Sequence, residues 1–195
     1  MRVKPKALKS GDRIAIVAPG SAAAEDKVKK GAQSLSGLGF EPVLGKTCFE
    51  KRGFMAGPDE VRLADLHWAF SDPSIRGIVC LRGGNGSGRL LPFLDMGLVE
   101  RNPKPFVGYS DITVFHTVFR QRGNFVTFHG PMASTDLSGK GAKPFTKESF
   151  LRALTSTEPL GLLGDTESGI VSLAGGKAEG EIVGGNLALI CSTLG

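Results

Sequence analysis

The chain is organised around the stretch Lys104-Pro105-Phe106-Val107-Gly108-Tyr109-Ser110-Asp111-Ile112-Thr113. Its apolar first half is typical of a strand, and the apolar residues after Asp111 repeat at helical spacing as far as Phe119. The pattern therefore predicts a strand, a sharp turn at Ser110 and a helix. In such a turn a serine can be held on a strained backbone beside the unpaired N–H groups of the first helical turn, which suit a developing oxyanion.

Two interpretations of Ser110 stay open from these residues. It can be a nucleophile at the carboxyl end of a strand. Alternatively, Ser110 and Asp111 can merely cap the helix that follows, because serine and aspartate are favoured caps. The common elbow motif G-x-S-x-G has a second glycine where this chain has Ile112, so the motif alone does not choose between them.

A nucleophilic serine also needs a base within hydrogen-bond reach. Downstream of Ser110 the histidines are His116 and His129. His116 lies among apolar helix residues, which favours a packed side chain. His129 ends a neighbouring strand and is the nearer candidate, but the sequence 129–131 is equally typical of a structural turn. The residues therefore suggest a nucleophile without a convincing base.

Strand and helix patterns alternate along the chain as far as residue 130. Besides the strand that ends at Ser110, strands are expected at 12–18, 40–44, 75–81 and 125–128. Helices are expected at 25–38, at 58–70, after the loop that ends at Arg89, and after Ser110. This alternation predicts an α/β fold with a mostly parallel sheet flanked by helices.

The last third of the chain has a different pattern. We expect a short helix over 146–154 capped by Thr146, short strands and turns over 158–183, and a new helix that begins near Val183. The predicted division is an amino-terminal α/β domain over 1–165, followed by a linker and the start of a second domain over 166–195.

A glycine-rich loop, Arg82-Gly83-Gly84-Asn85-Gly86-Ser87-Gly88-Arg89, follows the strand at 75–81. Ligands of parallel sheets bind beyond the carboxyl ends of the strands, where this loop, residues 19–21, Ser110 and His129 should gather. The loop matches neither the P-loop nor the dinucleotide fingerprint. We expect it to donate one N–H to an oxyanion, with Arg82 or Arg89 holding a substrate carboxylate.

Composition excludes several classes of protein. The 195 residues carry a net charge of +5, with 41% hydrophobic and 22% charged residues, as in ordinary globular proteins. The basic residues are scattered, which argues against nucleic-acid binding. Cys48, Cys80 and Cys191 are too widely spaced for a zinc site or a disulfide framework. No signal peptide or membrane span is recognisable, so we expect a cytoplasmic protein with no membrane partner and no bound metal.

Five segments together resemble the LD-carboxypeptidase family of serine peptidases, which includes the microcin-immunity hydrolases. In chain order they are Ala18-Pro19-Gly20-Ser21, Arg82-Gly83-Gly84, Gly108-Tyr109-Ser110-Asp111-Ile112-Thr113, His129-Gly130-Pro131-Met132 and Gly184-Gly185-Asn186-Leu187. The resemblance implies a Rossmann or flavodoxin-like amino-terminal domain that carries the serine of a Ser-Glu-His triad. It also implies a carboxyl-terminal domain that carries the glutamate and the histidine.

The resemblance assigns roles to particular residues. Ser110 matches the nucleophile, and the backbone N–H groups of Asp111 and Gly84 match the oxyanion-hole donors. In the same loop, Arg82, Gly83 and Asn85 are expected to contact substrate; Asn85 stands where relatives commonly have tyrosine. No residue of the chain matches the triad's glutamate or histidine, so residues 1–195 alone are expected to be inactive and to expose apolar surface meant for the second domain.

The reaction implied by the resemblance is release of terminal D-alanine from murein tetrapeptides during cell-wall recycling. No cofactor is implied; the partner is a murein peptide substrate, and a homodimer stays an open option. One alternative is a microcin-immunity type of hydrolase that acts on peptidyl-nucleotide amides. Another is a non-catalytic α/β module in which Ser110 is only a cap and the glycine-rich loop holds an anion.

Overall fold

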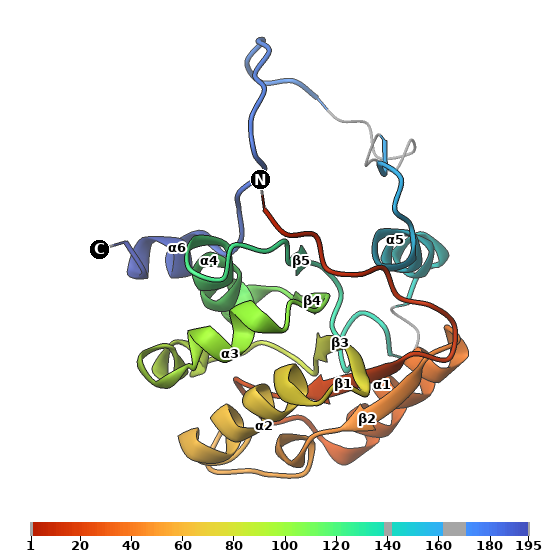
Figure 1. Cartoon of the computed structure of the whole chain (residues 1–195), viewed down its shortest axis with the longest axis vertical. Coiled ribbons are helices and arrows are strands. Elements are labelled where there is room, and N and C mark those ends of the chain that lie inside the picture. The colour runs from red at the N-terminus through yellow and green to blue at the C-terminus, as the bar shows by residue number, and fades with distance from the viewer. Residues whose placement is uncertain (1, 139–141, 162–170, 195) are drawn as a thin grey trace.

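The computed structural model describes residues 2–138, 142–161 and 171–194. Its centre is a sheet of five parallel strands in the order β2-β1-β3-β4-β5 (Figure 1). The strands are β1 Arg13–Val17, β2 Glu41–Leu44, β3 Ile75–Cys80, β4 Phe106–Gly108 and β5 Phe128–His129. This is the flavodoxin-like strand order, so the predicted α/β class and parallel sheet are confirmed.

Helices follow the strands and cover both faces of the sheet (Figure 1). The α-helices are α1 Glu25–Gly37, α2 Asp59–Ser71, α3 Met96–Arg101, α4 Thr113–Gln121, α5 Pro144–Thr155 and α6 Leu187–Ser192. Short 3₁₀ helices occur at η1 Lys46–Cys48, η2 Ser87–Phe93 and η3 Ser110–Ile112.

The core lies on both faces of the central strands, because alternate residues of a strand point to opposite sides. On β3, Ile78 and Cys80 pack into one apolar cluster with α2, α3 and α4. Val79, which lies between them in sequence, packs into the other cluster with α1 and α5. Burial on both faces explains the continuous apolar run at 75–81.

Before residue 156, three predicted elements differ from the structure. The fifth strand is Phe128–His129 and not 125–128, since Phe125 forms a separate parallel bridge with Val3. After the glycine-rich loop the chain first forms the 3₁₀ helix η2, which contains Pro92, and the α-helix α3 begins only at Met96, beyond this proline. Thr146 is not a cap, because α5 begins at Pro144, and proline fits the first helical position.

The end of the described chain returns to the sheet domain. Residues 158–161 and 171–183 contain no strand, so the short strands expected there are wrong for this part; the expectation for 162–170, where the predicted domain division falls, lies outside the described residues. The predicted last helix is present as α6, where the Asn186 side chain accepts from Leu189 N at 3.2 Å. Leu189 packs against the first core cluster, and α6 lies beside α4 (Figure 1).

None of the helices that the structure describes has both the length and the apolar character needed to cross a membrane.

Candidate active site

Ser110 sits at a strained turn between β4 and α4. Its φ is 62°, in the left-handed region that residues with a β-carbon rarely adopt. The neighbouring Gly108 makes this turn possible, because a β-carbon there would lie 2.8 Å from the Ile112 side chain. The predicted turn is therefore present, and Ile112 fills the space that the missing side chain of Gly108 leaves.

Capping does not account for Ser110 and Asp111. Tyr109 is the cap residue of η3 and Ile112 that of α4, and neither helix receives a side-chain cap hydrogen bond. The Asp111 carboxylate, only 3% exposed, instead accepts from the backbone N–H of Ser87 at 3.0 Å. The cap interpretation is thus wrong, because this carboxylate reaches across to the glycine-rich loop.

The glycine-rich loop packs directly on the serine turn. A β-carbon at Gly83 would lie 3.1 Å from Cβ of Ser110 and 3.2 Å from the Asp111 nitrogen, so glycine permits the close approach. Gly84 has φ 101°, and a β-carbon there would overlap the Ser21 hydroxyl. Within the described residues, the N–H groups of Gly84 and Asp111 donate to no acceptor. Two free donors therefore come from the segments on either side of this contact.

Ser21 connects the loop after β1 to the glycine-rich loop. Its backbone N–H donates to Gly83 O at 3.0 Å, and its hydroxyl accepts from Asn85 N at 3.1 Å. The predicted gathering of residues 19–21, the glycine-rich loop and Ser110 at the carboxyl ends of the strands is confirmed. The part played by the Ser21 hydroxyl was not evident from the sequence.

Arg62 is a second residue whose role was not evident from the sequence. Its side chain is completely buried and donates to the carbonyl oxygens of Pro19 and Gly86, and it forms an ion pair with Asp59. It therefore joins α2 to two loops of the site. A lone arginine between apolar positions of a predicted helix was the available signal, but the same pattern also fits an exposed position.

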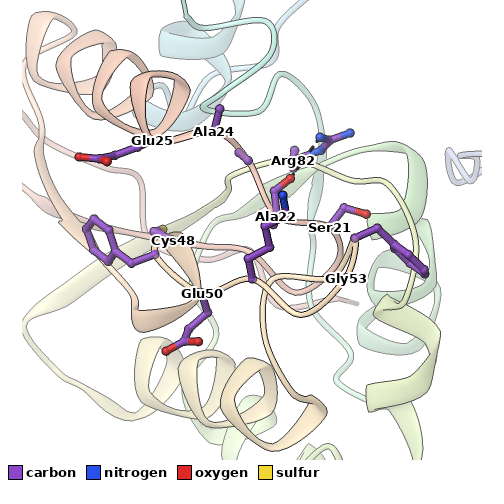
Figure 2. Close-up of a pocket in the computed structure, with 12 residues that line it drawn as sticks. Ser21, Ala22, Ala24, Glu25, Cys48, Glu50, Gly53 and Arg82 are labelled. Atoms are coloured by element: carbon purple, nitrogen blue, oxygen red, sulfur yellow. Dashed lines mark hydrogen bonds between the residues drawn. The ribbon is translucent and has the colours of Figure 1, made fainter.

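Arg82 precedes Gly83 in the glycine-rich loop, and its side chain reaches the segment after β1. Its Nη1 donates to Ala22 O at 3.2 Å. The side chain borders an open cleft of about 960 Å³, whose other walls are residues 21–25, 48–51 and 53–54 (Figure 2). Phe49 and Phe54 are exposed at this cleft, and Ser110 is not among its lining residues. The predicted carboxylate contact of Arg82 would therefore fall in the adjoining cleft.

The two downstream histidines differ in their surroundings. His116 is buried, with Nε2 2.8 Å from Gly108 O and Nδ1 2.8 Å from Thr127 Oγ1. Burial is the main cause that lowers the His116 pKa to about 4, and the nearby His129 adds to it. The interpretation of His116 as a packed helix residue is confirmed. His129 is exposed, opposite Gly108 in the sheet register, and makes no hydrogen bond to Ser110 in the described structure.

No group of three or more His, Cys, Asp or Glu side chains that could hold a metal ion is found in the part of the chain that is described. Cys48 and Cys80 are buried and Cys191 is exposed, all as free thiols.

A flavodoxin-like sheet with a strained serine at the carboxyl end of a central strand is an arrangement found in α/β hydrolytic enzymes. The chain belongs to the LD-carboxypeptidase family, since the model of the LD-carboxypeptidase N-terminal domain matches residues 14–130. This assignment confirms the resemblance noted in the sequence and classes the family as peptidases.

Curated relatives are similar along nearly the whole chain. The "Probable murein peptide carboxypeptidase" of Bacillus subtilis is 43% identical over 100% of this chain and 60% of its own length. The murein tetrapeptide carboxypeptidase of Pseudomonas aeruginosa is 38% identical over 94% of this chain and 61% of its own length. The chain thus spans about three fifths of these relatives.

Solved structures agree with this assignment. The MccF-like protein of Bacillus anthracis superposes with a TM-score of 0.74 and 34% identity, covering 79% of this chain and 47% of that one.

Proposed function

We propose that this protein is a serine-type LD-carboxypeptidase that releases terminal D-alanine from murein tetrapeptides during cell-wall recycling in the cytoplasm. One observation carries the proposal. Ser110 is held at φ 62° against Gly83, and the N–H groups of Asp111 and Gly84, which have no acceptor among the described residues, belong to the two segments in contact there. A reactive hydroxyl and two free backbone donors are what acyl transfer requires.

In the proposed reaction the Ser110 oxygen attacks the carbonyl carbon that precedes D-alanine. A histidine, oriented by a glutamate, takes the serine proton and later passes it to the leaving amine. The Asp111 and Gly84 N–H groups stabilise the oxyanion, and water then hydrolyses the acyl-enzyme. No covalent step requires a cofactor.

We assign the histidine and the glutamate to protein outside residues 1–195. His116 supports this assignment, because both of its ring nitrogens already have partners. The relatives also extend well beyond the part that this chain matches. Residues 1–195 alone are therefore expected to hydrolyse murein peptides very slowly, and the domains 1–165 and 166–195 remain our proposed division.

Arg82, Gly83 and Asn85 are the proposed substrate contacts. The guanidinium of Arg82 borders the adjoining cleft and suits a substrate carboxylate there. Gly83 lies against the Ser110 turn, where the scissile bond would be held. Asn85 is exposed at the tip of the loop, where its amide can contact a peptide.

A second candidate is hydrolysis of a peptidyl-nucleotide amide of the microcin type. It is favoured by the likeness to the microcin C7 self-immunity protein MccF of Escherichia coli, which is 27% identical over 87% of this chain. The same serine and donors would serve, so the two candidates differ in the substrate held by the loop and the cleft.

The test is D-alanine release from a murein tetrapeptide, followed by mass spectrometry with the complete gene product. We expect release by the wild type and none by Ser110→Ala, whereas Ser36→Ala, at an exposed position of α1, should behave as the wild type. Release that survives in Ser110→Ala would contradict the proposed nucleophile. No release by the wild type, with hydrolysis of a peptidyl-nucleotide amide instead, would favour the second candidate. Inertness toward both would contradict both candidates and favour a non-catalytic module in which the glycine-rich loop holds an anion.

A further inference from the structure

The carboxylate of Asp111 is hydrogen-bonded to the glycine-rich loop and not to its own helix η3. Asp111 is the second residue of η3, where an acidic side chain would ordinarily face the free N–H groups of its own helix. Its Oδ2 instead accepts from Ser87 N, 24 residues earlier in the chain and three residues after Gly84. Burial of a carboxylate is costly unless it is hydrogen-bonded, and the N–H of Ser87 provides that hydrogen bond.

The surroundings of the carboxylate leave it little freedom. A β-carbon at Gly20 would lie 2.7 Å from Asp111 Oδ2 and 3.3 Å from Ser87 Oγ, so the chain after β1 packs closely on this hydrogen bond. The Ser87 hydroxyl is buried without a partner among the described residues, whereas its backbone N–H is paired with Asp111. The backbone of the loop, and not the hydroxyl, is what Asp111 holds.

Three side chains hold the glycine-rich loop by hydrogen bonds to its backbone. Ser21 accepts from Asn85 N, and Arg62 donates to Gly86 O at 3.0 Å; these two connect the loop to the segment after β1 and to α2. Asp111 connects it to the serine turn. Among the described residues, the hydrogen bond from Ser87 N to Asp111 is the one that joins the loop to the serine turn. The other contact between the two segments is close packing at Gly83.

An oxyanion hole requires its two donors to point at one oxygen, each at about 2.7–3.1 Å. Here the proposed donors are on separate segments, Gly84 N on the loop and Asp111 N on the turn. We propose that the Asp111 side chain is a positioning residue that holds the loop on the serine turn, so that both N–H groups meet the same oxyanion. This inference rests on the proposed function and extends it from the backbone of Asp111 to its carboxylate.

The test compares Asp111→Asn with Asp111→Ala in the complete gene product. Asparagine retains an oxygen that can accept from Ser87 N, whereas alanine does not. We expect the asparagine variant to keep at least about half of the wild-type kcat. The alanine variant should lose about tenfold to a hundredfold in kcat with KM within about twofold, because the misplaced donor acts on the transition state.

A merely structural role would give a different result. Asp95→Ala is the matched control for Asp111→Ala, since Asp95 also accepts from a backbone N–H, that of Leu98 at 2.8 Å, but caps helix α3. A peptide boronate that mimics the tetrahedral intermediate supplies a second readout. Its affinity should fall in parallel with kcat in Asp111→Ala and stay unchanged in the Asp95 variant.

A kcat for Asp111→Ala within about twofold of the wild type would overturn the inference, as would equal losses in the asparagine and alanine variants. If Asp111→Ala melts below the assay temperature, Asp111→Ser, polar but too short to reach Ser87, replaces it with the same expected loss. Activity that is lost in Ser110→Ala but kept in Asp111→Ala would sink only this inference. Inactivity of the wild type would instead count against the proposed function.

Discussion

The guanidinium of Arg62 lies wholly inside the protein and donates a 3.0 Å hydrogen bond to the carbonyl oxygen of Gly86. The same group also reaches the carbonyl of Pro19 and the carboxylate of Asp59. A helix on one face of the sheet therefore determines the positions of two loops at the carboxyl ends of the strands. Arg89 pairs with the same carboxylate from the protein surface, which gives a direct comparison of a buried and an exposed arginine.

Arg62→Met is expected to lower the free energy of unfolding by at least about 3 kcal/mol, because it leaves buried carbonyl groups and an acidic partner without their donor. Urea denaturation monitored by circular dichroism measures this change. Arg89→Met is the control; its side chain is 61% exposed, so a far smaller effect is expected. Equal losses in the two variants would show that burial of Arg62 is not what makes it important.

If the proposed D-alanine release is the reaction, Gly84→Ala is expected to lower its kcat by about tenfold or more, because a β-carbon would displace Ser21 and move the Gly84 N–H. The contact is severe: the added carbon would lie 2.2 Å from the Ser21 oxygen, at a φ of 101°. Gly88→Ala, in the same loop but with no atom within 4 Å of the added carbon, should leave kcat nearly unchanged. A Gly84→Ala enzyme as active as Gly88→Ala would contradict the proposed place of Gly84 in the oxyanion hole.

His116 is expected to make stability fall as the pH is lowered from about 6.5 to 4. Burial lowers the His116 pKa to about 4 in the folded protein, whereas an unfolded chain binds the proton near pH 6.5. Between these values the unfolded state binds more protons, so the free energy of unfolding rises with pH, by about 3 kcal/mol in total. Comparing thermal or urea unfolding of wild type and His116→Gln from pH 4 to 7 isolates this slope. Identical slopes would refute the assignment.

Cys191 is expected to react with a disulfide reagent far faster than the other two thiols. It is exposed, whereas burial raises the pKa of Cys48 to about 12 and that of Cys80 well above its usual value. Reaction of Cys48 at pH 8 should be on the order of a thousandfold slower than that of an ordinary thiol. Ellman titration should therefore give one fast equivalent in the folded chain and none in Cys191→Ser. Two fast equivalents in the wild type would contradict the burial of Cys48 or Cys80.

Local pattern was sufficient wherever one segment carries the whole signal. The apolar run at 75–81 and the helical spacing at 25–38 match β3 and α1 closely. A strand buried on both faces has a continuous apolar sequence, and a helix buried on one side has apolar residues at helical spacing. The turn at Ser110 was recognisable for the same reason. The predicted fifth strand was misplaced by about three residues, because Phe125 pairs with Val3, more than a hundred residues away, and not with the sheet strand β4.

The sequence by itself determined the alternation of strands and helices and the serine turn, which depend on neighbouring residues. The alternation in turn predicted the parallel sheet. The tertiary structure was needed to find that Arg62 is buried, that the Ser21 hydroxyl accepts from Asn85, and that Asp111 serves Ser87 rather than its own helix. These contacts join residues 24 to 64 positions apart. The sequence does not distinguish a charged or hydroxyl side chain that faces water from one that is bonded to a distant backbone group. Only the folded chain brings the partners within 3 Å or so, where hydrogen bonding distinguishes the two cases.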